Sequence, residues 1–355
     1  MKHWIISTIA TARICLSLQS APGTICWSLA AAAESSETPA DTLAPAQLAV
    51  ENVTIAVTFS PGSLELPRSQ LLDWITVSAR GVARYYGQFP VSHVRVLLTL
   101  EKGAGVRSGT THGGQDPSIK IWLGQFTEAE MLQRDWIMTH EMVHLAFPNV
   151  PDTHQWLEEG LATYVEPLAR LGVGQVQAEK VWQDLVDGLP HGLPKSGDQG
   201  LDYTHTWGRT YWGGALFCLL ADLEIRQRTA NARGLQDALR AIVAAGGTMA
   251  AAWPLPRALQ VGDQAVGVSV LTDLYERMKA RPVDINLVDL WQRLGVEGRG
   301  DTVVLHDDAP LAAVRRAITT AAQDEEQLPK KATPQGRNRT ESKKKIKSGG
   351  DAVIE

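Results

Sequence analysis

Cysteine is scarce in this chain of 355 residues, which contains three. Cys15 and Cys26 fall in the first 33 residues, a segment that we expect to be removed from the mature protein. Cys218 would then remain alone, which excludes an intramolecular disulfide. Because it lies in an apolar predicted helix, we expect Cys218 in the hydrophobic core.

Long apolar runs are absent after residue 33, so no membrane span is expected in the mature chain. Before that point, Lys2, an apolar run over 4–12 and small residues up to Ala33 predict a signal peptide over 1–33. An uncleaved anchor is the alternative, but Arg13 interrupts the apolar segment. The predicted localisation is therefore periplasmic or extracellular, in a bacterial-type envelope.

Positive charge is scarce in the body of the chain, where residues 34–329 contain 24 basic and 36 acidic side chains. This negative field repels phosphate, so we expect no nucleic-acid partner. Residues 34–50, rich in Ala, Pro, Ser and Thr, predict a flexible lead-in. The basic segment 326–355 has too few apolar residues to fold and predicts a disordered tail. Nothing in the sequence indicates an oligomeric state.

The folded domain is predicted to span 51–325, β-rich over 51–125 and helical over 126–325. A strand, helix, strand opening is expected over 52–58, 68–86 and 93–100, then a loop over 103–117 and a strand over 118–124. Helices are expected over 127–145 and 154–169, and at about 206–227, 231–245, 270–280, 286–293 and 310–320. Thr127 and Glu130 have the spacing of a capping box. This order predicts an α+β fold.

The first helix of the helical region contains the pattern HExxH. His140 and His144 are four residues apart, so a helix stacks both imidazoles on one face, where they can bind one zinc ion. Glu141 lies about 100° around the helix from His140, within reach of a metal-activated water. These residues predict two zinc ligands and a general base.

A carboxylate on the next predicted helix would complete a zinc site with two histidines and one glutamate. Glu158 and Glu159 both precede Gly160, and His154 is a weaker alternative ligand. HExxH followed by W-L-x-E-G-x-A, here beginning at Trp156, resembles the gluzincin metallopeptidases of the peptidase MA-like group. The resemblance implies Glu159 as the third ligand of one zinc ion per chain.

The same resemblance assigns two further residues on the helical side. Glu166 matches an acid that holds a ligand histidine in related aminopeptidases, with an exposed helix-end glutamate as the alternative. Residues 210–216 and 220–226 resemble two segments of the glycyl aminopeptidase family, whose tyrosine donates to the oxyanion; this implies Tyr211. Tyr203 and His205 are alternative donors. Gly213 replaces a lysine of that family, which leaves the lysine's role without a counterpart.

The resemblance has consequences for fold and substrate. It implies a thermolysin-like catalytic domain, with a small N-terminal sheet followed by a mainly helical subdomain and without the flanking domains of those relatives. Aminopeptidases of this group bind the substrate amine with a glutamate, but 112–117 reads HGGQDP, where Asp116 precedes a proline. An amine pocket is therefore not expected, and aminopeptidase and endopeptidase action both stay open. The strand over 118–124 is expected to be the edge that pairs with the peptide.

The sequence thus predicts an exported zinc metallopeptidase that cleaves a peptide or protein substrate. Glu141 would act as general base and Tyr211 as oxyanion donor. The alternative is a catalytically silent gluzincin-fold module for binding or envelope assembly, and a third possibility is hydrolysis of a non-peptide bond. Five tryptophans fall near the motifs: Trp122, Trp136, Trp156, Trp207 and Trp212. Core packing is expected for most of them, and lining of a cleft is the alternative for some.

Overall fold

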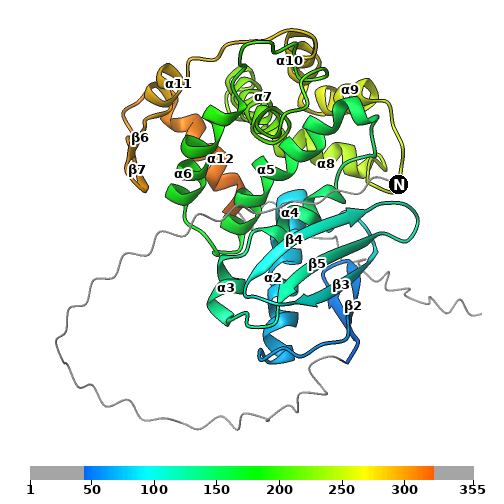
Figure 1. Ribbon diagram of the computed structural model, residues 1–355. Helices are drawn as coiled ribbons and strands as arrows, with labels where there is room; N and C mark the ends of the chain where they lie inside the picture. The colour runs from blue at the N-terminus through cyan, green and yellow to red at the C-terminus, as the bar shows by residue number, and fades with distance from the viewer. Residues whose placement is uncertain (1–43, 324–355) are drawn as a thin grey trace, which may run out of the picture. The chain divides into compact units, whose positions relative to one another are not determined.

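The computed structural model describes residues 44–323 and begins with a five-stranded mixed sheet in the order β1-β2-β3-β5-β4. The strands are β1 (Ala46–Val50), β2 (Val53–Phe59), β3 (His93–Glu101), β4 (Val106–His112) and β5 (Ser118–Gly124). β2, β3 and β5 run parallel, whereas β1 and β4 pair antiparallel at the two edges. Helix α2 (Arg68–Tyr86) connects β2 to β3 and passes behind the strands in Figure 1.

Alternation along the central strands explains how the sheet buries one face. Every second residue of β2, β3 and β5 is buried: Val53, Ile55, Val57, Val94, Val96, Leu98, Ile119, Ile121 and Leu123. The register aligns them across the strands, since Val96 lies opposite Ile119 and Leu98 opposite Ile121. This apolar face provides the rigid platform that the following helices cover.

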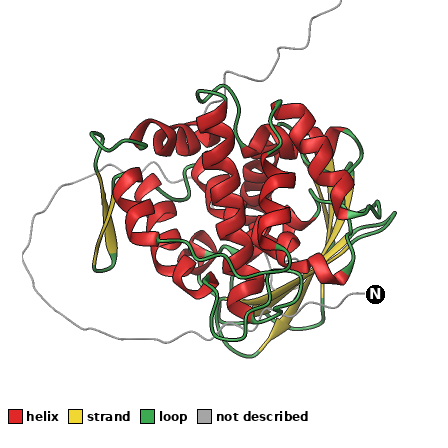
Figure 2. Cartoon of the chain, turned by 90° about the horizontal axis from the view of Figure 1, so that it is seen from above, coloured by secondary structure: helices red, strands yellow, loops and turns green. Residues whose placement is uncertain are grey.

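The chain after β5 is predominantly helical, and Figure 2 shows its helices packed together with the strands at the periphery. Its helices are α3 (Ala129–Arg134), α4 (Ile137–His144), α5 (Gln155–Gly172), α6 (Ala178–Gly188), α7 (Gly214–Arg228), α8 (Leu235–Ala244), α9 (Leu255–Val266), α10 (Val270–Met278), α11 (Leu287–Leu294) and α12 (Ala312–Gln323). Short turns η1 (Asp152–His154) and η2 (Leu189–Gly192), the π-helical turn η3 (Arg209–Gly213) and a hairpin of β6 (Val296–Arg299) with β7 (Thr302–Leu305) complete it. The predicted α+β order, sheet first and helices second, is confirmed.

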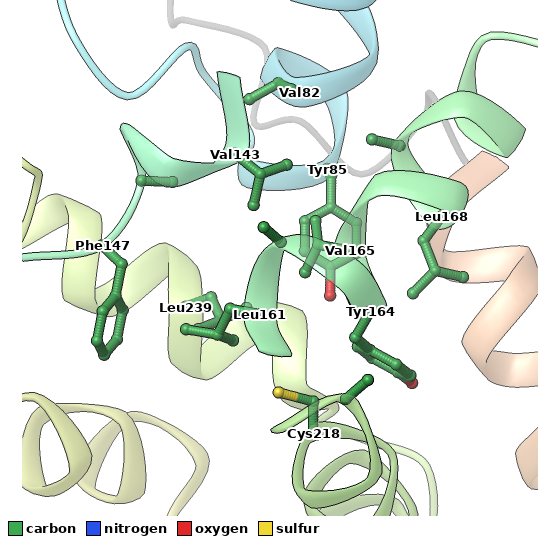
Figure 3. Packing of buried hydrophobic residues seen from close by; sticks show 14 of the residues in the cluster. Val82, Tyr85, Val143, Phe147, Leu161, Tyr164, Val165, Leu168, Cys218 and Leu239 are labelled. Atoms are coloured by element: carbon green, nitrogen blue, oxygen red, sulfur yellow. The ribbon is translucent and has the colours of Figure 1, made fainter. Parts of the chain in front are cut away.

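Helix α5 lies at the centre of the core and contacts α2, α4 and α7. Figure 3 shows Leu161 and Val165 of α5 among side chains from the neighbouring helices, including Val143 of α4 and Cys218 of α7. Cys218 is 1 % exposed, as expected for a core residue. Among the described residues, 44–323, no helix combines the length and apolarity that a membrane crossing requires.

Two strands correct the sequence predictions for the N-terminal half. Residues 46–50 form β1 and pair with β2, so the last part of the expected flexible lead-in 34–50 is ordered sheet. The expected loop 103–117 contains β4, which occupies the sheet edge. Strand β5 therefore lies between β3 and β4, and the prediction that 118–124 forms the edge is wrong. The apolar pattern did not reveal β4, because its buried residues are Gly109, Thr110 and Thr111 rather than large apolar side chains.

The expected helix over 127–145 is two helices, α3 and α4, separated at Asp135. The capping box is also absent there, because the Thr127 hydroxyl donates to the carbonyl of Gly124 and accepts from the amide of Gly105. The predicted signal peptide 1–33, residues 34–43 of the lead-in and the predicted tail 326–355 lie outside the described residues. Export to the periplasm or beyond stays a prediction.

Candidate active site

Helix α4 carries the HExxH pattern, and its N-terminus is fixed by Asp135. The carboxylate of Asp135 accepts from the amides of Ile137 at 3.0 Å and Met138 at 3.1 Å. It also accepts from the indole of Trp74 on α2 at 3.1 Å. Two amides that an isolated helix would leave unpaired are thereby satisfied, and α4 is tied to α2. All residues of α4 before His144 are buried, so the helix holds its histidines rigidly.

His140, His144 and Glu159 converge where α4 meets α5. Oε2 of Glu159 lies 3.3 Å from Nε2 of His140 and 3.6 Å from Nε2 of His144. Each residue offers one ligand atom, and the three atoms lie within 4.8 Å of one another. Zinc binds such atoms at about 2.0 to 2.1 Å, which places two ligands of a tetrahedral site roughly 3.4 Å apart. The spacing therefore fits a single zinc ion.

The protonation of these groups also suits a cation. Burial lowers the pKa of His140 to about 3 and that of His144 to about 4, so both imidazoles are neutral at physiological pH. Burial raises the pKa of Glu159, whose carboxylate is 2 % exposed and faces both rings. A buried acid between two neutral imidazoles has no compensating positive charge in this cluster, and a divalent cation would supply one.

The rival ligands are engaged elsewhere. Oε1 of Glu158 accepts from the amide of Val150 at 3.2 Å. Nδ1 of His154 lies 3.0 Å from Oδ1 of Asp202, which also accepts from the indole of Trp156 at 2.8 Å. Neither Glu158 nor His154 belongs to the cluster that the structure brings together.

Glu166 fits neither role considered for it. Its carboxylate is buried and accepts from Arg170 Nη1 at 3.0 Å, one turn further along α5. Nδ1 of His140 is buried and has no hydrogen-bond partner within the described part of the chain. Glu166 is thus an internal ion-pair residue, neither exposed nor hydrogen-bonded to a ligand histidine.

Glu141 points from α4 toward the edge strand β4. The hydroxyl of Thr111 donates to Oε2 of Glu141 at 2.6 Å and lies 2.8 Å from its backbone oxygen. A Cβ at Gly109 would come within 2.7 Å of Oε1 and 2.5 Å of Cγ of Glu141, so only glycine leaves room there. Burial raises the pKa of Glu141 to about 8 in the absence of a metal ion, an effect that the Thr111 hydrogen bond opposes. A divalent cation in the adjacent cluster would lower this pKa and favour the ionised carboxylate that a base requires. The strand therefore fixes the carboxylate beside the ligand cluster.

Tyr211 reaches the cluster from η3. Its ring stacks on that of His140, with centroids 6.4 Å apart and planes 24° apart. Burial, together with the nearby carboxylates of Glu159 and Glu141, raises the pKa of Tyr211 well above its ordinary value. The phenol therefore stays protonated and can donate. The other candidate donors, Tyr203 and His205, are exposed on the preceding loop.

A close crossing of α5 and α7 brings Glu159 and Tyr211 together. A Cβ at Gly160 would lie 2.3 Å from Cα of Gly214, and a Cβ at Gly214 would lie 1.9 Å from the carbonyl oxygen of Trp156. The two backbones thus touch at adjacent glycines. The sequence motifs contain both glycines but do not predict their contact. The sequence analysis also missed Asp135, because it predicted no helix boundary at 135, and Gly109 and Thr111, because it predicted no strand over 106–112.

Comparison with known proteins supports the fold. No family model matches the sequence, and no curated protein matches it. Among solved structures, the aminopeptidase N family protein from Idiomarina loihiensis is similar over 71 % of this chain, with a TM-score of 0.51 and 13 % identity. The M1 zinc metallopeptidase from Deinococcus radiodurans is similar over 68 % of this chain, with a TM-score of 0.43 and 17 % identity.

The chain spans about half the length of these proteins, 49 % of the first and 51 % of the second. The first similarity shows that this chain shares the fold of that aminopeptidase N family protein, in agreement with the predicted order of a small sheet followed by helices. At such low identity the likeness concerns the fold alone, and the chemistry of the site has to be argued from its residues.

Proposed function

We propose that this protein is a zinc-dependent metallopeptidase that hydrolyses peptide bonds. The observation that carries the proposal is the convergence of His140, His144 and Glu159 in a buried site with zinc-like spacing. Glu141 and Tyr211 flank this site from two different elements. Three protein ligands leave the fourth coordination position of zinc open for water. With a base on one side of that position and a hydrogen-bond donor on the other, the site is suited to amide hydrolysis.

The residues divide the reaction between them. Zinc held by His140, His144 and Glu159 would supply Lewis-acid polarisation and lower the pKa of water. Glu141, oriented by Thr111, accepts a proton from the attacking water and passes it to the nitrogen of the departing amine. The Tyr211 hydroxyl donates to the oxygen of the attacked carbonyl, where negative charge develops.

The proposal is tested with the purified chain and a Glu141→Gln variant prepared in parallel. Zinc content is determined, and both proteins are incubated with a mixed peptide library that is then analysed by mass spectrometry. We expect about one zinc in each and cleavage by the unsubstituted chain alone, since a general base contributes about 10²- to 10⁴-fold. The cut positions would also distinguish aminopeptidase from endopeptidase action.

Two results would redirect the proposal. Full zinc content without cleavage by either protein would favour the binding or assembly module, or a non-peptide substrate. Retained turnover in the variant would refute Glu141 as the base. Detection of the mature chain in a periplasmic or extracellular fraction would test the proposed export.

A further inference from the structure

Trp207 is a large apolar side chain that stays 61 % exposed although it lies four residues before Tyr211. Its ring centroid lies 6.2 Å from that of Tyr211 and 5.7 Å from that of His191. The Tyr211 ring stacks in turn on His140. A row of four aromatic rings therefore leads from a predicted zinc ligand to the surface.

The backbone that carries Trp207 is held in place by η2 and its surroundings. A Cβ at Gly208 would lie 2.2 Å from the carbonyl oxygen of His191, so the two backbones are in direct contact. The next residue, Arg209, is 3 % exposed, and its Nε lies 2.7 Å from Oδ2 of Asp198. The indole is consequently presented by a fixed segment of chain, which lowers the entropic cost of binding against it.

Exposure alone would carry little meaning, because isolated exposed apolar side chains are common on protein surfaces. Phe126 is 55 % exposed and Val288 is 67 % exposed. Within the described residues, however, the structure records no ring contact between Phe126 and the row that ends at His140. Position beside the catalytic tyrosine is what distinguishes Trp207.

We propose that Trp207 forms an apolar wall of the substrate-binding site and favours peptides with an aromatic or large aliphatic side chain beside the attacked bond. This inference rests on the proposed peptidase function. The rings of Tyr211 and Trp207 are 6.2 Å apart, and consecutive Cα atoms of a peptide are about 3.8 Å apart. A side chain next to a carbonyl at the Tyr211 hydroxyl can therefore reach the indole, which buries apolar surface and stacks on aromatic rings.

The test measures binding, so that it does not depend on turnover. Zinc-loaded full-length Glu141→Gln protein is titrated calorimetrically with blocked decapeptides of alanine and glycine, in which phenylalanine replaces alanine at each position in turn. We expect one position at which phenylalanine tightens binding by about tenfold. Adding Trp207→Ala should reduce this preference to less than about twofold, whereas Trp207→Phe should retain most of it. Val288→Ala, the matched control at an exposed site on α11, should leave the preference unchanged.

Three results would overturn the inference: no preference for phenylalanine at any position, a preference that survives Trp207→Ala, or an equal loss of affinity for all peptides. The last result would mean that Trp207 only supports Tyr211. Cleavage by the unsubstituted chain is measured separately. Turnover without a Trp207-dependent preference for phenylalanine would refute this inference and leave the proposed peptidase function standing. The preference without turnover would support Trp207 as a wall of the binding site and refute the proposed peptidase function.

Discussion

The close crossing of α5 and α7 predicts a large effect of one methyl group, in the substitution Gly160→Ala. The new Cβ would lie 2.3 Å from both Cα and the carbonyl carbon of Gly214 and 2.8 Å from the nitrogen of Ala215. Carbon atoms in favourable contact are about 3.5 to 4.0 Å apart, so the helices must separate by more than about 1 Å. The obstacles are backbone atoms, which cannot rotate away.

Two opposing terms set the expected stability change. Overpacking of a dense core costs about 1 to 3 kcal/mol, and backbone contacts favour the upper end. Replacing glycine by alanine inside a helix recovers about 1 kcal/mol of helix propensity. We therefore expect a net loss of about 2 kcal/mol, which lowers Tm by roughly 3 °C in a chain of this size, since the unfolding entropy is about 2.1 cal/mol/K per residue.

The same displacement should affect the site, because Glu159 precedes Gly160 directly and Tyr211 lies three residues before Gly214. A misplacement of about 1 Å at a catalytic group can lower turnover by about 10²-fold. The assays are thermal unfolding and peptide turnover on the same preparations. Gly298→Ala in β6 is the control, because its Cβ would make only an ordinary 3.5 Å contact with Val186. A Tm for Gly160→Ala equal to or above that of the parent chain would refute the reasoning.

Three further predictions concern single groups at or near the site. Tyr211→Phe should lower turnover by about 10²- to 10³-fold at unchanged zinc content, and an undiminished rate would assign the oxyanion to another donor. Chelation of zinc should lower the Tm of the parent chain, because a metal that binds only the folded state stabilises it. The Tm of Glu159→Ala, which has lost a ligand, should not change on chelation, and equal shifts in both proteins would contradict the ligand assignment. Burial raises the pKa of Asp135 to about 6, above its ordinary value of 3.8, so the folded state holds the proton more tightly between these values. The free energy of unfolding should accordingly fall as pH rises from about 4 to 6 relative to Asp135→Asn, and parallel urea-unfolding profiles for the two proteins would contradict this.

The elements found from sequence were those with strong periodicity. The buried alternation of β2 and β3 and the amphipathic helix α2 fall close to their expected bounds, because apolar spacing alone encodes them. Strand β4 was missed because its glycine, serine and threonine residues resemble a loop, although pairing with β5 makes it a strand. The break between α3 and α4 was missed because it depends on an acceptor, Asp135, that hydrogen-bonds across to Trp74 on α2.

The burial of the tryptophans could likewise not be predicted from the sequence. Of the five near the motifs, Trp136 and Trp212 are half-buried against the core and Trp122 is half-buried on β5. Trp156 is buried, with 1 % exposure, whereas Trp207 is exposed beside Tyr211. Composition and spacing do not separate these two cases, since both residues lie in helical, motif-rich segments. The choice depends on which neighbouring element covers the ring.

The sequence by itself determined the pairing of His140 with His144 and the place of Glu141, because positions four and one apart on a helix have fixed relative directions. It could only suggest Glu159 and Tyr211 through resemblance, since these residues lie 15 or more positions from His144 along the chain. The tertiary structure decided which rivals joined the site. Contact between Gly160 and Gly214 brings the two helices together, and the partners of Glu158 and His154 hold those side chains elsewhere. The spacing of residues along a helix sets their relative directions, whereas the convergence of side chains from different helices depends on how closely distant backbones can pack.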